Sequence, residues 1–275
     1  MDFDFNRIST PFRMQPGLSR LHADAIHLTR LNNGSALYCE KLSVSRSGAA
    51  HQCVKGFDPS NAIRTIWGNA RSTLSLGDDL PTEIELAFEE DFALLDAATG
   101  TIPWMCVCVP SHWAPEEKLG KSIAAIHAPV ADNADLQRAL SRLSSVVCQG
   151  GHWERFVWTI SPSPRYDQHP RRQARSAWPS TCSLEELVAG CHFRAERQTF
   201  LPVHDGSGTS LSQAVFTIRV MLAPLVRVVH TREQARRLHG ALQSMSAEVL
   251  AYKNLAGARA PLLEWLSSWH EGQNP

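Results

Sequence analysis

The chain has 275 residues, of which 43% are hydrophobic and 20% charged, a composition typical of a globular protein with a substantial core. Its 27 basic and 27 acidic residues cancel, which gives no electrostatic reason to expect a nucleic acid or an anionic membrane as partner. No apolar run approaches the roughly 20 residues of a membrane span, and the N-terminal MDFDFNRIST lacks signal-peptide character. The seven cysteines include no CxxC pair, so we expect reduced thiols and a cytoplasmic protein.

The first part of the chain predicts an irregular N-terminal segment and then alternating elements. These are one or two strands over 34–45, a helix over 59–76, a helix over 83–99 and a central strand over 102–110. The run Thr82-Glu83-Ile84-Glu85 is typical of a capping box, and Gly100 would end the helix that it opens. On that helix, Glu89-Glu90-Asp91 would form a solvated acidic face.

The second part of the chain predicts a hairpin between groups of helices. The expected elements are a helix from about 132, a strand over 155–161, a polar loop over 162–182, a helix from 184, strands over 193–203 and 213–222, and helices from 231 and near 261. This order favours an α+β fold in which helices wrap an antiparallel sheet of about five strands.

Common catalytic signatures are missing from the sequence. There is no HExxH, no Walker loop, no GxGxxG and no GxSxG. The twelve histidines show no metal-ligand spacing. The sequence therefore argues against four classes of protein: zinc proteases, P-loop enzymes, Rossmann dehydrogenases and α/β-hydrolases.

The stretch PWMCVCVPSHWAPEEKLGKSIAAIHAPV, residues 103–130, is the most informative one. A buried strand leads through a Pro/Ser/Trp turn into a short helix that ends at His127. A histidine in such an apolar setting is either a satisfied core residue or a ligand of a metal or heme iron.

Arginines in apolar strands are the second unusual feature. If 193–200 is a strand, Arg194 shares one face with Glu196 and Gln198, while Arg197 lies on the other face. Arg219 is a third arginine between apolar residues. A buried arginine needs an anionic partner, which is either a glutamate on a neighbouring strand or an acidic ligand such as a heme propionate.

The chain as a whole resembles the heme-dependent oxidative N-demethylase alpha-subunit family. The segments that carry the resemblance are RMQPGLSRL (13–21), EEDFALLD (89–96), CVCVPSHWAPEEKLGKSIAAIHAPV (106–130), RFVWTI (155–160), FRAERQTF (193–200), AVFTIR (214–219) and EVLAYKNL…LLEWL (248–266). Each motif is modest, but their order and spacing together are fairly specific.

The resemblance implies one heme b-binding, PAS-like domain over residues 1–275, with an irregular N-terminal segment and C-terminal helices. It implies a monooxygenase that acts on an amine or amino-acid-derived substrate with dioxygen. Electrons would come from an external flavin and iron–sulfur reductase. Where the family usually has Arg-x-Asn-Trp, this chain has Arg155-Phe156-Val157-Trp158. The alternative is a non-catalytic heme-PAS sensor, or a scaffold that has lost heme.

The resemblance also assigns candidate site residues. His127 is the expected iron ligand, with His192 and His204 as runners-up. A thiolate from Cys106 or Cys108 is a weaker alternative, because no cysteine precedes a proline. The candidate propionate partners are Arg194, Arg197 and Arg219, followed by Lys118 and Lys121.

Overall fold

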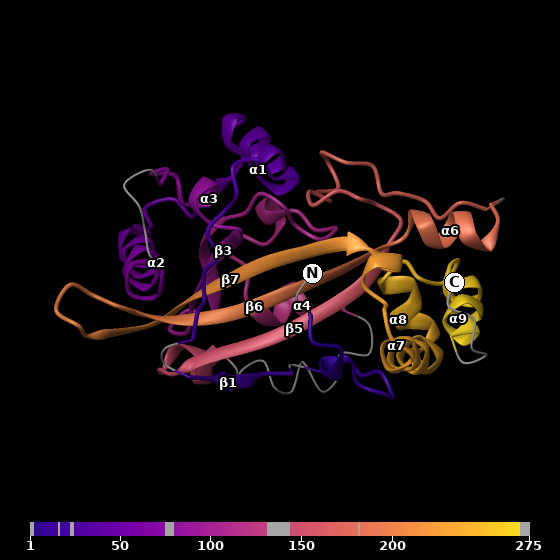
Figure 1. The fold of residues 1–275 in the computed structure, drawn as a ribbon. Helices are drawn as coiled ribbons and strands as arrows, with labels where there is room; N and C mark the ends of the chain where they lie inside the picture. The colour runs from indigo at the N-terminus through magenta and orange to yellow at the C-terminus, as the bar shows by residue number, and fades with distance from the viewer. Residues whose placement is uncertain are drawn as a thin grey trace.

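The centre of the molecule is one seven-stranded sheet (Figure 1). The structure is a computed structural model that describes residues 3–15, 17–22, 25–74, 80–130, 144–180 and 182–269. The spatial order is β1-β5-β6-β7-β3-β4-β2, and every paired neighbour is antiparallel. The strands are β1 (Ser19–Leu21), β2 (His51–Cys53), β3 (Glu90–Asp96), β4 (Thr101–Cys106), β5 (His152–Ser161), β6 (His192–His204) and β7 (Ser210–Pro224).

The helices surround this sheet. They are α1 (Ala36–Arg46), α2 (Ser60–Thr73), α3 (Ile84–Ala87), α4 (Ile123–His127), α6 (Leu184–Gly190), α7 (Arg232–Ser244), α8 (Ala247–Tyr252) and α9 (Arg259–Ser268), with 3-10 turns η1 (Phe5–Arg7), η2 (Pro115–Glu117) and η3 (Leu225–Arg227). The predicted α+β class is confirmed. In the part of the chain that the structure describes, no helix is long and apolar enough to cross a membrane.

The predicted size of the sheet, about five strands, is wrong because both edges carry a short additional strand. β1 pairs with β5, and β2 pairs with β4, over three residues each. Three residues are too few to show a periodic pattern, so neither strand could be recognised from the sequence. The strand at 102–110 is confirmed over β4, although β4 lies next to the edge rather than at the centre.

The helix predicted over 83–99 is also wrong. Helix α3 ends at Ala87, and β3 follows between β7 and β4, where Leu94 lies opposite Val215 and Trp104. Residues buried on both faces form a continuous apolar run that does not distinguish strand from helix. Glu90 and Asp91 are consequently buried in the sheet instead of forming a solvated face.

Residues 34–45, predicted as strand, form α1 instead. The Ser35 hydroxyl accepts a hydrogen bond from the Tyr38 N–H at 3.0 Å and caps the helix. Lys41 on α1 forms an ion pair with Asp91 of β3, Nζ to Oδ1 3.0 Å, and both side chains are fully buried. This contact fixes α1 against the sheet.

The hairpin of β6 and β7 is confirmed and is the longest feature of the sheet; its tip extends beyond the other strands (Figure 1). The helices predicted from 184 and 231 are confirmed as α6 and α7, each with a capping box. The helix predicted from about 132 begins in 131–143, which lies outside the described residues.

One face of the sheet is covered by helices. Near one end, α2 packs Ile66 against Phe92 and Leu94. At the other end lie α7, α8 and α9 (Figure 1). Their buried side chains and those of the N-terminal segment pack with Trp158 and Phe193. The opposite face borders a large cavity.

Candidate functional site

A cavity of about 690 Å³ lies on the face of the sheet opposite helix α2. Its volume is within the range of cofactor sites, roughly 300–1,000 Å³. Side chains from five strands form its floor: Arg155, Val157, Thr159, Arg194, Glu196, Gln198, Phe200, Phe216, Ile218, Ala93, Leu95, Ile102 and Met105. Helix α4, the loop 111–113, the N-terminal segment and residues 251–253 complete the walls.

Strand register explains why these residues share the cavity. Arg194 lies opposite Thr159, and Glu196 lies opposite Val157, across the β5–β6 pair. Directly opposed residues of antiparallel strands project to the same face. The prediction that Arg194, Glu196 and Gln198 share one face, away from Arg197, is confirmed.

Helix α4 brings His127 to the cavity. Ser122 caps the helix by accepting from the Ala125 N–H at 3.2 Å. The His127 Nδ1–H donates to the Ile123 carbonyl at 2.9 Å. Burial lowers the pKa of His127, which favours the neutral ring. This hydrogen bond selects the tautomer with its lone pair on Nε2 and fixes the plane of the ring.

A clamp holds the loop 111–113 against β6. The Arg194 Nε donates to the Ser111 hydroxyl at 2.8 Å, and its terminal nitrogens donate to the carbonyls of Arg165 and Val109, each at 3.2 Å. Ser111 in turn hydrogen-bonds Glu196. Arg194 is therefore in the cavity wall, and its guanidinium is bonded within the protein. In the same loop, His112 adopts φ 60°, a strained conformation for a non-glycine residue.

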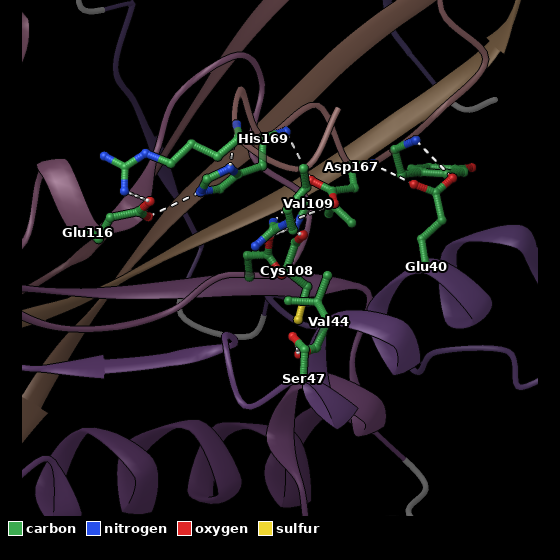
Figure 2. A network of polar contacts seen from close by, with 12 residues as sticks. Glu40, Val44, Ser47, Cys108, Val109, Glu116, Asp167 and His169 are labelled. Atoms are coloured by element: carbon green, nitrogen blue, oxygen red, sulfur yellow. Dashed lines mark hydrogen bonds and ion pairs between the residues drawn. The ribbon is translucent and has the colours of Figure 1, made fainter. Parts of the chain in front are cut away.

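The long loop after β5 is anchored from two sides (Figure 2). Glu40 of α1 accepts the backbone N–H groups of Tyr166 and Asp167 at 3.1 and 2.7 Å. Arg172 pairs with Asp167 at 2.8 Å and donates to the Cys108 carbonyl at 2.9 Å.

On the other side of this loop, the His169 ring donates from Nε2 to Glu116 at 3.1 Å, because its Nδ1 accepts from the Arg171 N–H (Figure 2). The predicted polar loop over 162–182 is thus irregular but held in place. Its anchors present Gln168 and Arg175 to the cavity.

Arg155 is a cavity cation that the sequence prediction missed. It lies on β5 opposite Gln198 and lines the cavity. Its Nε is buried and has no hydrogen-bond partner among the described residues. Burial lowers the pKa of its guanidinium, opposed by the charge of Glu196. A desolvated guanidinium with an unmet donor is suited to an anionic ligand group.

Two lysines also line the cavity. Lys118 lies over the Trp113 ring, with Nζ 5.1 Å from the centroid, and burial lowers its pKa. Lys253 donates to the Trp158 carbonyl at 2.7 Å, and burial lowers its pKa to about 8. Together with Arg155 they give the cavity a cationic character, which the single carboxylate of Glu196 offsets only in part.

Other predicted site residues lie away from the cavity lining. Arg197 forms an ion pair with Glu154, and Arg219 forms one with Glu89, each at 2.7 Å. A glutamate partner of this kind was the alternative to a heme propionate in the sequence analysis. Lys121 is exposed.

The runner-up ligands are likewise outside the lining. His192 and His204 occupy opposite ends of β6, and Cys106 and Cys108 are buried elsewhere. The role of His127 as iron ligand stays a prediction. Its position in the cavity lining is compatible with that role.

A family model described as "Haem-dependent oxidative N-demethylase, alpha subunit-like" matches residues 75–263. The chain belongs to this family. A search of curated proteins gives no significant match.

The N-demethylase-like family match covers most of the cavity. It includes α4, β5, β6 and the loop 111–113. The wall that residues from 7–15 and Gly17 form lies before the matched range. Val157, the position at which the resemblance described above leads us to expect asparagine, lines the cavity.

Proposed function

We propose that this chain is a heme-dependent oxidoreductase that binds heme b in the cavity and oxidises an amine or amino-acid-derived substrate. Membership of a family named for heme-dependent oxidative N-demethylation supports the reaction class. The observation that carries the proposal is the joint presence in the cavity of His127 and of Arg155, whose buried Nε has no hydrogen-bond partner among the described residues.

The residues present fit heme in three respects. The volume of about 690 Å³ is large enough for the macrocycle, and Phe216, Ile218 and Met105 offer apolar contacts to it. His127 offers a neutral imidazole oriented by a backbone carbonyl, as iron-ligating histidines usually are. Heme carries two propionates, and Arg155 and Lys118 would hold them in place of water. The propionate roles predicted for Arg194, Arg197 and Arg219 remain alternatives.

Bound heme would supply the activation of dioxygen. The chain's own residues would orient the substrate and exclude water. Glu196 is held by Ser111 and by the Gln198 amide, whose Nε2 donates at 2.6 Å. A carboxylate has about four lone-pair sites, so Glu196 has acceptor capacity left for a substrate ammonium. The apolar Val157 beside it would favour a substrate whose carbon chain lies against β5.

For N-demethylation the overall balance is simple. One oxygen atom of O₂ enters the N-methyl carbon, the C–N bond breaks, and formaldehyde and the demethylated amine leave. The second oxygen atom leaves as water after taking two electrons and two protons. An external flavin and iron–sulfur reductase would deliver the electrons, and a cytoplasmic setting would suit such a partner.

The test is substrate-dependent turnover by the heme-loaded chain with a surrogate reductase and NADPH. We expect a secondary N-methylamine or N-methyl amino acid to raise the oxygen consumption, with one formaldehyde released per O₂ consumed. Stoichiometric heme without substrate-dependent consumption across such a panel would contradict the enzyme and favour the heme-PAS sensor.

A further inference from the structure

A second group of donor atoms lies on the face of the sheet away from the cavity. It consists of His51 on β2, Glu85 on α3 and Cys106 on β4. The His51 Nε2 is 2.9 Å from the Glu85 Oε2 and 3.5 Å from the Cys106 Sγ. The Cys106 Sγ is 3.7 Å from the Glu85 Oε2, which closes the triangle.

This triangle matches one face of a tetrahedral metal site. Zinc binds sulfur at about 2.3 Å, nitrogen at about 2.0–2.1 Å and carboxylate oxygen at about 2.0–2.2 Å. Tetrahedral angles then place neighbouring donors about 3.3–3.6 Å apart. The Cys106–His51 distance of 3.5 Å lies within this range, and the Cys106–Glu85 distance of 3.7 Å is slightly above it. The His51–Glu85 distance of 2.9 Å would open by about 0.4 Å.

The backbone fixes two of the three donors. His51 and Cys106 are directly opposed in the β2–β4 pair, so both side chains project to the same face. Glu85 is oriented by Ser45, whose hydroxyl donates to Oε1 at 2.8 Å while Oε2 faces the other two donors. Carboxylate ligands of metals usually have such a hydrogen-bonded neighbour.

Burial and charge suit a cation with one coordination position open to solvent. Cys106 is fully buried, and the Glu85 side chain is 4% exposed, whereas 47% of the His51 side chain is accessible. A divalent cation with one thiolate and one carboxylate is electrically neutral, which lowers the cost of burying it. Access past His51 would also let water act as the fourth ligand.

We propose that His51, Glu85 and Cys106 bind one divalent transition-metal ion of the zinc type. The mixed nitrogen, sulfur and oxygen donor set suits Zn²⁺ and disfavours Mg²⁺ and Ca²⁺, which take oxygen ligands. Binding displaces the Cys106 thiol proton to solvent and forms the metal–sulfur bond. The ion links the edge strand β2 and helix α3 to β4, on the far side of the sheet from the heme cavity.

The test uses the full chain and Zn²⁺ alone as probe. Competition with a chromophoric chelator gives stoichiometry and affinity, and X-ray absorption at the zinc edge reports the ligands independently of heme. We expect one zinc per chain, with one sulfur at about 2.3 Å and nitrogen or oxygen at about 2.0–2.1 Å. Cys106→Ala should lower the affinity at least 100-fold, and Ser45→Ala about 10-fold.

Cys108→Ala is the matched control, because Cys108 is equally buried two residues along the chain and belongs to a different cluster. It should bind zinc like the parent chain. His51→Ala alters an exposed edge residue, so it tests the site even if Cys106→Ala folds poorly. Zinc binding that lacks a sulfur ligand, or that is unchanged in His51→Ala, would overturn the proposal, as would the absence of a one-to-one complex.

Discussion

Val157 of β5 lies directly opposite Glu196 of β6, and both side chains line the cavity. An apolar side chain thus faces a carboxylate that the protein holds with Ser111 and Gln198. An amide at this position would add a donor and an acceptor beside the carboxylate. This pair is where we expect substrate preference to be set.

Val157→Asn should therefore shift the preference toward small, polar methylamines. We expect kcat/KM for such an amine to rise about tenfold relative to a longer-chain substrate, the equivalent of one added hydrogen bond. Heme content should not change, and Val157→Leu should show no such shift. An unaltered substrate ratio in Val157→Asn would show that this position does not select the substrate.

Arg155→Ala should weaken heme retention by about 10- to 150-fold, the 1.5–3 kcal/mol of a charge-assisted contact. The reason is that the buried Nε of Arg155, in the cavity wall, has no hydrogen-bond partner in the part of the chain that the structure describes. The rate of heme transfer to apomyoglobin measures the effect. Arg219→Ala is the comparison variant, because its guanidinium pairs with Glu89. An equal loss of heme retention in both variants would favour the propionate-binding role that the sequence predicted for Arg219.

Lys41→Met should destabilise the fold by about 3–5 kcal/mol, because it leaves Asp91 as an unpaired buried charge. Lys41 also donates to the carbonyls of Phe88 and Glu90, at 3.1 and 2.7 Å, and these bonds would be lost as well. Denaturant unfolding gives the free energy. Lys55→Met, at an exposed position, should change it by no more than about 0.5 kcal/mol. A loss below about 1 kcal/mol for Lys41→Met would mean that the pair contributes little.

Glu90 should make the stability fall with rising pH. Burial raises the pKa of its carboxyl from 4.5 to about 7, so the folded state retains a proton that the unfolded chain releases. Stability from this residue is complete below pH 4.5 and is lost as pH rises to about 7, by up to ~1.4 kcal/mol per pH unit. Glu90→Gln does not titrate there, so its stability relative to the parent should improve by about 1–3 kcal/mol between pH 5 and 8. If the difference in stability between Glu90→Gln and the parent did not change with pH, Glu90 would not be the group that makes the stability depend on pH.

The elements that the sequence predicted correctly had local signals. The strands at 155–161, 193–203 and 213–222 are β-branched and aromatic-rich, and the helices at 184 and 231 begin with capping boxes that the structure contains. β3 was mistaken for helix because burial on both faces removes the twofold period. α1 was mistaken for strand because the contact that fixes it, the buried ion pair of Lys41 and Asp91, joins residues that are 50 positions apart. A reading of the local sequence around Lys41 does not reveal such a partner.

The residues of the candidate site also differ in whether the local sequence indicated them. His127 was singled out because one short segment combines strand, turn and helix end, and the structure brings it to the cavity. Arg155 was overlooked because nothing local separates it from Arg197 or Arg219; only the partners of each guanidinium do. His51, Glu85 and Cys106 come from three separate elements, so no spacing along the chain could indicate their meeting.

The central claim is that His127 binds heme iron in the cavity, and absorption spectra test it most directly. The chain and its His127→Ala and His192→Ala variants would be expressed with ample heme and measured oxidised, reduced and with carbon monoxide. We predict a Soret band that shifts with carbon monoxide in the parent and in His192→Ala, and loss of most heme or an altered spectrum in His127→Ala. A parent chain without a Soret band, or a His127→Ala variant with unchanged heme content and spectra, would contradict the account.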